Sequence, residues 1–335
     1  MTLSTYIQKL PKAELHLHIE GSLTPELMWH LASKHNITLA YNSVDEISAA
    51  YNFSDLQSFL DIYYAGASVL KDEDDFYALM WDYLKRCNED NIVHTEIMFD
   101  PQTHTQRGVG FDIFMPGFLR AMRDAKKAFG TSSLLIMSFL RHLSEDEAFQ
   151  TLAEAEPYYS DIAAVGLDSS ELGHPPSKFE RVFKKAKALG FKIVAHAGEE
   201  GPAEYIWEAI RLLDVDRIDH GVRCQEDEKL MGYLETHQIP LTVCPLSNLK
   251  LCVVDDLSQH NILSLLESGL LVTVNSDDPT YFGGFLNDNF HALTKALPIT
   301  SSQLKQLALN SFAASFLDED EKQFFYSQVE AVQIV

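Results

Sequence analysis

The sequence predicts an α/β protein whose eight strands close into a (β/α)8 barrel of the TIM type. Short apolar runs alternate with longer helical patterns along the chain, which is typical of parallel strands covered on both faces. There are eight such strand–helix units, the number that closes a barrel, and 335 residues accommodate one with insertions. Unusual polar residues follow most of the runs directly, as expected at the carboxyl face of such a barrel.

The first half of the barrel contains the longest connection. Thr24-Pro25-Glu26 has the N-cap, the first-position proline and the first-turn acid of a helix start. Helical periodicity then continues over Asp55–Leu70 and Asp74–Cys87, so a helical insertion separates strands one and two. The stretch Val44–Leu70 exceeds one helix in length, and we expect it to be the lid of any site.

The later units are shorter and regular. The expected strands are Glu14–Ile19, Val93–Phe99, Ser133–Leu140, Ile162–Leu167, Phe191–Ala195, Arg217–Asp219, Pro240–Val243 and Leu270–Val274. The expected later helices are Phe111–Phe129, Glu145–Ala155, Pro176–Leu189, Pro202–Leu213, Glu228–His237 and Asn261–Ser268, before a helical tail.

An open, doubly wound sheet is the alternative fold. Such a fold would place a glycine-rich phosphate loop after the first strand, whereas Gly21 stands alone there. We therefore expect a single barrel domain over residues 1–335.

The overall charge restricts the partners. Asp and Glu outnumber Lys and Arg by 49 to 26, giving a formal charge of −23, and there is no basic run. This composition argues against nucleic acid and anionic membranes as partners and leaves a small molecule. The four cysteines form no Cys-x-x-Cys pair, and no signal or membrane segment is present, so we expect free thiols in a reducing cytoplasm.

A metal site is the main chemical prediction. His16 and His18 are two residues apart, so both imidazoles point to one face of a strand, as half of a metal site or as two hydrogen-bonded histidines. His196 and Asp277 follow the fifth and eighth strands, and the barrel brings these ends together. Zinc takes imidazole and carboxylate ligands readily. We therefore expect His16, His18, His196 and Asp277 to hold one divalent metal, with zinc favoured, and to leave a position for water; four unrelated polar residues are the alternative.

The other histidines carry no such prediction, apart from His220, which follows the sixth strand. We expect the rest to be surface or satisfied core residues, namely His30, His35, His94, His104, His142, His174, His237, His260 and His291.

Five motifs in chain order resemble those of the adenosine/AMP deaminase family, within the metal-dependent amidohydrolase superfamily. They are Leu-His-Leu-His-Ile-Glu-Gly at 15–21, His-Ala-Gly-Glu at 196–199, Asp-His-Gly at 219–221, Cys-Pro-Leu-Ser-Asn at 244–248 and Ser-Asp-Asp-Pro at 276–279. A lone His-x-His would be weak, but the five together span strands one to eight. The resemblance implies a barrel that deaminates a purine with the metal ligands given above.

The resemblance also implies three further roles. Glu199 would be the proton shuttle, His220 would orient the attacking water, and Asp278 would recognise the base. Attack at C6 of a purine requires N1 to gain a proton, so Glu199 would need a raised pKa in a closed pocket. The alternatives are a first-turn helix acid for Glu199, a core histidine for His220 and a helix cap for Asp278.

Two departures from the adenosine pattern suggest a free base as substrate. Adenosine deaminases typically carry Asp after the His-x-His motif and Asp-Leu-Ala-Gly after strand four, whereas this chain has Glu20 and Asp168-Ser169-Ser170-Glu171. These features resemble the adenine deaminase branch. We expect Glu20 or Glu171 to meet the N3–N9 edge of adenine, the alternative for Glu171 being a helix cap or a surface ion pair.

The expected activity is therefore hydrolysis of adenine to hypoxanthine and ammonia in purine salvage. Adenosine or an N6-substituted adenine is the nearest alternative substrate. A metal-dependent hydrolase of another substrate, or a non-catalytic metal-binding barrel, is the more distant alternative.

Overall fold

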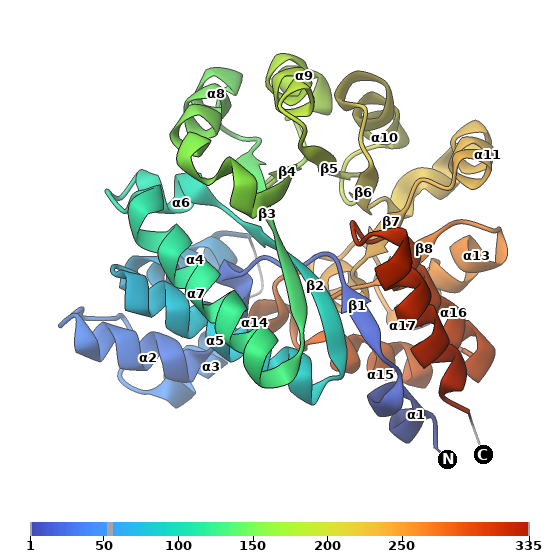
Figure 1. The fold of residues 1–335 in the computed structure, drawn as a ribbon, viewed down its shortest axis with the longest axis horizontal. Coiled ribbons are helices and arrows are strands. Elements are labelled where there is room, and N and C mark those ends of the chain that lie inside the picture. The colour runs from blue at the N-terminus through green and yellow to red at the C-terminus, as the bar shows by residue number, and fades with distance from the viewer. Residues whose placement is uncertain (1, 52–55, 334–335) are drawn as a thin grey trace.

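Eight parallel strands form one barrel in chain order (Figure 1). The computed structural model describes residues 2–51 and 56–333. The strands are β1 Lys12–Glu14, β2 Ile92–Phe99, β3 Ser132–Leu140, β4 Ile162–Asp168, β5 Lys192–Ala197, β6 Arg217–His220, β7 Leu241–Val243 and β8 Val272–Val274. The predicted barrel is confirmed, and most strand boundaries lie within two residues of the expected ones.

The first strand differs from the prediction of Glu14–Ile19. Its ladder with β2 ends at Glu14, and the following residues bridge two neighbours instead. The Asp277 N–H donates to the His16 carbonyl (3.1 Å) and the His18 N–H donates to the Asp277 carbonyl (2.9 Å). On the other side, the Met98 N–H donates to Leu17 (2.8 Å). The His-x-His segment therefore closes the barrel between β8 and β2.

Helices cover the outside of the barrel, and the N- and C-terminal ends of the chain lie beside each other (Figure 1). The α-helices are α1 Leu3–Lys9, α2 Pro25–Lys34, α3 Val44–Ala50, α4 Leu56–Val69, α5 Glu73–Glu89, α6 Pro101–Thr105, α7 Phe111–Phe129, α8 Glu145–Glu154, α9 Glu180–Ala188, α10 Ala203–Glu208, α11 Glu228–His237, α12 Pro245–Lys250, α13 Ile262–Glu267, α14 Pro279–Phe282, α15 Leu286–Ala296, α16 Ser301–Ala313 and α17 Glu319–Ala331. Short 3-10 segments are η1 Glu20–Ser22, η2 Glu156–Asp161, η3 Pro176–Phe179, η5 Val222–Glu226 and η6 Leu257–Gln259, and η4 Ala209–Leu213 is a π-helix.

The helical insertion between strands one and two is confirmed as α2–α5. The Thr24 hydroxyl accepts the Leu27 N–H (3.2 Å), which is the expected N-cap. The stretch predicted as the lid contains α3 and α4, but residues 52–55 lie outside the described part of the chain, and the lid role stays a prediction. Two later helices are less regular than predicted: 176–189 begins as a 3-10 segment, and 202–213 ends as the π-helix.

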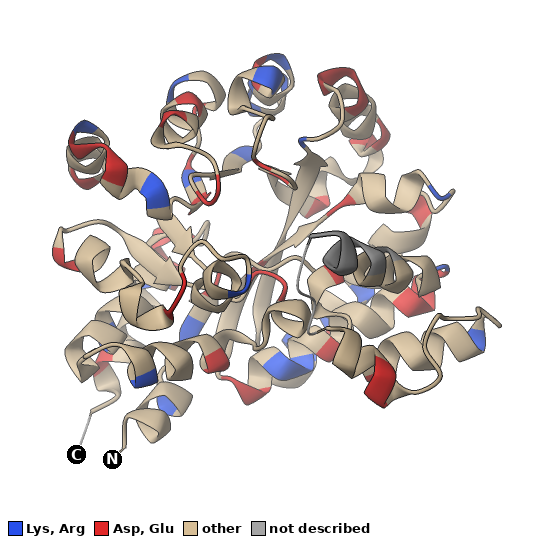
Figure 2. Cartoon of the chain, turned by 180° about the vertical axis from the view of Figure 1, so that it is seen from behind, with Lys and Arg blue, Asp and Glu red and all other residues tan. Residues whose placement is uncertain are grey.

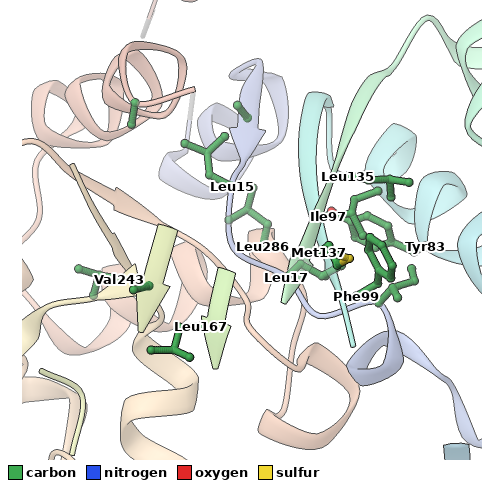
Figure 3. Close-up of a cluster of buried hydrophobic side chains, with 14 of the residues drawn as sticks. Leu15, Leu17, Tyr83, Ile97, Phe99, Leu135, Met137, Leu167, Val243 and Leu286 are labelled. Carbon is green, nitrogen blue, oxygen red and sulfur yellow. The ribbon is translucent and has the colours of Figure 1, made fainter. Parts of the chain in front are cut away.

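The apolar core has two parts, one on each side of the barrel wall. The interior part consists of Met98, Ile136, Ala164 and Val194, and the first three are register partners on adjacent strands. The larger part fills the space between strands and helices. Figure 3 shows side chains of this outer layer, among them Ile97, Phe99, Leu135, Met137 and Tyr83. Residues alternate between the two layers along β2, so the strands are apolar on both faces.

Charge is spread over the covering helices. In Figure 2 acidic segments occur on many helices and loops, and basic segments lie scattered among them. No helix in the described part of the chain has the length and hydropathy that a membrane span requires.

Candidate active site

The predicted metal ligands converge at the carboxyl ends of the strands. His16 and His18 come from the segment after β1, His196 from the end of β5, and Asp277 from the turn after β8. One ligand atom from each lies within 4.8 Å of all the others. The structure therefore brings together residues separated by up to 261 positions in the sequence.

The spacing of these ligand atoms suits a small metal ion. The Asp277 Oδ1 atom lies 3.5 Å from the Nε2 atoms of both His16 and His18. The Nε2 atoms of His18 and His196 are 3.2 Å apart. Bonds of about 2.0–2.1 Å to a tetrahedral zinc would place ligand atoms about 3.3 Å apart. The four side chains thus already have the separation that such an ion requires.

Hydrogen bonding fixes the tautomer of His16. The Thr242 hydroxyl donates to Asp219 Oδ1 (2.8 Å), so its oxygen accepts the His16 Nδ1 proton at 3.0 Å. Nε2 therefore carries a lone pair, and it is buried without a hydrogen-bond partner among the described residues. Such an orphaned atom, aimed at three other ligand atoms, fits a resident metal.

Acidic side chains also lie behind the other two imidazoles. Asp168 Oδ2 lies 3.4 Å from His18 Nδ1, and Asp219 Oδ2 lies 3.6 Å from His196 Nδ1. Carboxylates behind metal-binding histidines hold the ring orientation and keep the proton on Nδ1. Burial lowers the pKa of His196 well below its usual value, so this ring is neutral, as a ligand must be.

The fourth ligand is oriented by a hydroxyl. Ser247 Oγ donates to Asp277 Oδ2 (2.6 Å), which leaves Oδ1 facing the histidines. Asp277 also has a positive φ of 65°, as does His220. Non-glycine residues in this region are strained, and such strain is concentrated at functional sites.

A second potential ligand group lies away from the barrel mouth. His35, Asp72 and Asp75 also have ligand atoms within 4.8 Å of one another. Here Lys34 Nζ already donates to Asp75 (2.7 Å) and Asp72 (2.9 Å), and His35 bonds Asp75. The charges are thus compensated by protein groups, and this cluster caps α5.

Glu199 and His220 lie beside the ligand group. His220 Nε2 is 3.5 Å from Glu199 Oε2 and 3.7 Å from Asp277 Oδ2. Burial and the neighbouring His16 lower the pKa of His220 to about 3, so it is neutral at pH 7. Burial raises the pKa of Glu199 well above its usual range, and the charge of Asp277 raises it further. A neutral carboxyl and a neutral imidazole therefore face the site together.

The Glu199 side chain forms part of the wall of a cavity of about 460 Å³. Val222, Asn248 and Leu251 line the same cavity. Glu199 therefore borders a hollow of small-molecule size, while only 12% of its side chain is exposed.

Asp278 occupies a place that Gly21 leaves open. A Cβ atom on Gly21 would lie 1.9 Å from Asp278 Oδ1 and 2.6 Å from its Cα. Burial raises the pKa of Asp278 well above its usual range, and the adjacent Asp277 raises it further. The first and last motifs therefore interlock, and a protonated Asp278 has a hydrogen to donate.

Glu20 is buried beside the ligand group and is only partly satisfied. Its Oε1 atom accepts the Asp100 N–H (3.2 Å) and the His104 Nε2 proton (2.7 Å). The His104 tautomer follows from Arg107, which donates to Nδ1 at 2.8 Å. Glu20 Oε2 has no hydrogen-bond partner among the described residues, and burial raises the pKa of the carboxyl to about 7.

Glu171 does not lie where the sequence analysis expected it. Both of its oxygens accept backbone N–H groups, with Oε1 bonded to Gly198 and Oε2 to Glu199, Glu200 and Gly201. We therefore withdraw the interpretation of Glu171 as a contact to the purine edge. The helix-cap alternative is closer to what the structure shows, although Glu171 binds the segment that follows β5 and not the helix that follows β4.

A family model described as adenosine deaminase matches residues 11–332. The chain belongs to the adenosine deaminase family. The adenine deaminase of Acinetobacter baylyi is 62% identical over 332 residues, which cover 99% of this chain and 100% of that protein.

Solved structures agree with this assignment. The adenine deaminase of Arthrobacter aurescens has a TM-score of 0.93 and 48% identity, covering 96% of this chain and 98% of that one. An amidohydrolase from Burkholderia ambifaria with bound zinc has a TM-score of 0.91 and 25% identity, covering 99% of this chain and 94% of that one. The fold is therefore that of adenosine deaminase family members.

Several residues of this adenosine deaminase family site were not singled out from the sequence. Asp100 and Asp219 lie behind the histidines, and Ser247 holds Asp277. Asp100 follows the second strand directly, the same signal that identified the other strand-end residues. His104 was expected to be a satisfied residue, which it is, but its partner is Glu20.

Proposed function

We propose that this chain is an adenine deaminase that converts adenine and water to hypoxanthine and ammonia. The observation that carries the proposal is 62% identity to an adenine deaminase along 99% of the chain. The site geometry agrees with it, because metal ligands and a neutral acid lie at one barrel mouth.

His16, His18, His196 and Asp277 would hold the metal, and their donor set favours zinc. The zinc bound by the Burkholderia amidohydrolase supports this choice. When bound, the metal lowers the pKa of a coordinated water to about 7 and so supplies a nucleophile at neutral pH. Thr242, Asp168 and Asp219 would orient the three imidazoles.

Three protein groups would manage the protons of the reaction. Glu199 donates its carboxyl proton to N1 of the purine, which removes the negative charge that would develop on the ring after attack at C6. His220 hydrogen-bonds the attacking water and sets its direction. Asp278 donates to N7, which holds the base plane against the metal side of the pocket. The attacking water supplies the two protons that complete the reaction: one returns to Glu199 and the other reaches N6, so that breaking the C6–N6 bond releases ammonia.

Glu20 would favour the free base over a nucleoside. Its Oε2 atom is buried and has no protein partner in the described residues, so it is available for the N3–N9 edge of adenine. That edge carries a proton only when no sugar is attached. His104 and the Asp100 N–H hold the other oxygen and thereby fix the carboxylate in place.

The proposal treats residues 1–335 as one catalytic domain, supported by a family match that covers 11–332. We further expect the enzyme to act in the cytoplasm, where its four cysteines stay reduced.

Formation of hypoxanthine from adenine or N6-methyladenine, and of inosine from adenosine, by zinc-loaded protein tests the proposal. Adenine and adenosine release ammonia, whereas N6-methyladenine releases methylamine. Adenine should turn over at least about 100-fold faster than adenosine, since a buried unmatched polar contact costs about 1–3 kcal/mol and a sugar must also be accommodated. Faster turnover of adenosine would refute the adenine assignment. No deaminated product from any of the three would favour another hydrolase or a non-catalytic protein.

Two variants connect the assay to the residues. Glu199→Gln should lower kcat by at least about 100-fold while zinc stays bound at wild-type stoichiometry. Loss of zinc in this variant would instead make Glu199 a ligand. Glu20→Asp should narrow the preference for adenine over adenosine, and an unchanged preference would remove Glu20 from substrate selection.

A further inference from the structure

Glu171 binds an unusual number of backbone groups for one side chain. Four consecutive N–H groups, from Gly198 to Gly201, donate to its carboxylate at 2.6–3.0 Å. Glu171 is only 2% exposed. These four residues, called the Glu199 loop here, connect β5 to α10 and carry the proposed proton donor. Hydrogen bonds to a carboxylate are about twice as strong as those between neutral groups, so the loop conformation depends on Glu171.

The Glu199 loop is shaped to receive this carboxylate. A Cβ atom on Gly201 would lie 2.5 Å from Glu171 Oε1 and 2.6 Å from its Cδ. Gly198 has a positive φ of 72°, which turns the chain so that its N–H joins the other three. The loop is therefore built around Glu171 and would have to move if the carboxylate were displaced.

Arg141 places a buried guanidinium near Glu171. It is fully buried, and its Nη1 and Nε atoms donate to the carbonyls of His196 (2.7 Å) and His174 (2.8 Å). Burial lowers the pKa of Arg141, and the charge of Glu171 is the largest influence that opposes this. Arg141 thus connects His196, two residues before the Glu199 loop, to His174, three residues after Glu171.

We propose that Glu171 is a positioning residue, which sets the place of Glu199 through the backbone of the Glu199 loop. This inference rests on the proposed function, because Glu199 must reach N1 of the purine for its position to matter. Glu171 acts from behind the loop, so substrate binding does not depend on it directly.

The position of Glu171 also affects the pH dependence of activity. The charged or titratable groups that interact with Glu199 come from several strand ends and from its own loop. They are Asp277 and Asp278 after β8, His220 at the end of β6, Cys244 after β7, Arg141 after β3, Glu171 after β4, and Glu200. Removing the charge of Glu171 therefore lowers the pKa of Glu199. Activity falls at alkaline pH as Glu199 loses its proton. Without the charge of Glu171, this alkaline limb of the pH profile should move to lower pH.

Glu171→Gln is the main test, since it keeps the size but places an amide NH2 against backbone N–H groups. We expect kcat on adenine to fall about 10- to 100-fold, with KM within threefold of wild type, zinc content unchanged and the alkaline limb moved to lower pH. Glu208→Gln is the matched control, because Glu208 receives a single backbone N–H, from Ser177 (2.9 Å), and should keep wild-type kcat.

Amide hydrogen exchange gives a readout that needs no turnover. Exchange at 198–201 should quicken in Glu171→Gln and stay at the wild-type rate in Glu208→Gln. A raised KM with unchanged kcat would make Glu171 a substrate contact and overturn the proposal. Lowered kcat without faster exchange in the loop would overturn it as well.

Gly201→Ala covers the case in which Glu171→Gln does not fold. The added methyl group displaces the carboxylate without removing its charge, so kcat should fall and exchange should quicken, while the alkaline limb stays near its wild-type position. Wild-type kcat in Gly201→Ala would contradict the positioning role. If wild-type protein releases no ammonia from adenine, the proposed function fails, yet exchange at 198–201 still tests whether Glu171 holds the loop.

Discussion

At the scale of single residues, the site depends on how closely backbone segments approach. Gly21 belongs to the first motif and Asp278 to the last, and the Asp278 Cα lies 2.6 Å from where a Cβ on Gly21 would be. Backbone atoms cannot move aside as a flexible side chain can. The absence of a side chain at position 21 is thus a condition for the placement of Asp278.

Gly21→Ala should therefore displace Asp278 and lower kcat/KM on adenine by about 100-fold or more, because small misplacements at a reacting centre cost that much. Gly232→Ala is the control: it lies within α11, an added Cβ meets no atom within 4 Å, and stability should rise by about 0.5–1 kcal/mol. Steady-state kinetics and urea unfolding measure both. Wild-type kcat/KM in Gly21→Ala would show that Asp278 does not contact the base.

At the scale of elements, the junction of α1 and β1 contains a buried lysine. Lys12 is 1% exposed, and its Nζ atom donates to the carbonyls of Ile7 (2.8 Å) and Leu10 (2.7 Å). Burial lowers its pKa from 10.5 to about 7, although the charges of Asp90 and Glu14 oppose this shift. The lysine connects the first helix to the start of the barrel. Its burial disfavours the charged form of the amine.

The pH dependence of stability tests this junction. Between about pH 7 and 10.5 the unfolded chain binds more protons than the folded chain, so the contribution of Lys12 to stability rises with pH. From pH 7 to 9, wild type should gain about 2 kcal/mol in unfolding free energy relative to Lys12→Met. Lys9→Met, at an exposed position at the end of α1, should show no such difference. Equal pH slopes for wild type and Lys12→Met would refute the burial of a titrating amine.

At the scale of the whole molecule, one strand of the barrel carries both a buried ion pair and a residue that supports the metal ligands. Arg217 Nη1 donates to Glu96 Oε2 (2.6 Å), and both side chains are fully buried. Two residues further along β6, Asp219 lies behind His16 and His196. Strand β6 thus contributes to the buried ion pair and to the support of the ligands. Metal binding should therefore be coupled thermodynamically to folding.

Zinc removal should abolish turnover and also lower the unfolding free energy. The loss should be about 2.7 kcal/mol relative to protein with free zinc at 100 times its Kd. Chelator dialysis, zinc readdition, calorimetry and metal analysis measure these effects. His35→Gln should keep one zinc per chain, since Lys34 already compensates the acids of that cluster. Full turnover by zinc-free protein would exclude the metal from the reaction.

Much of the fold and of the ligand group could be predicted because each rests on local sequence. The apolar runs gave eight strands near their observed positions, and the helix 111–129 is matched at both ends. His16, His18, His196 and Asp277 were found because barrel strand ends meet wherever they fall in the sequence. The short ladder of β1 was missed because the segment after Glu14 bonds to β2 on one side and to the turn after β8 on the other.

The sequence by itself determined the order of strands and helices, the ligand types and the family, since these follow from periodicity and from motifs of adjacent residues. The tertiary structure decided which partner each carboxylate meets. Glu171 was expected at the purine edge, yet four N–H groups from another strand–helix connection occupy it. Glu20 accepts the Nε2 proton of His104, 84 residues away. Side-chain partners of this kind depend on which loops come together in the fold. The spacing of residues along the sequence does not show which loops these are.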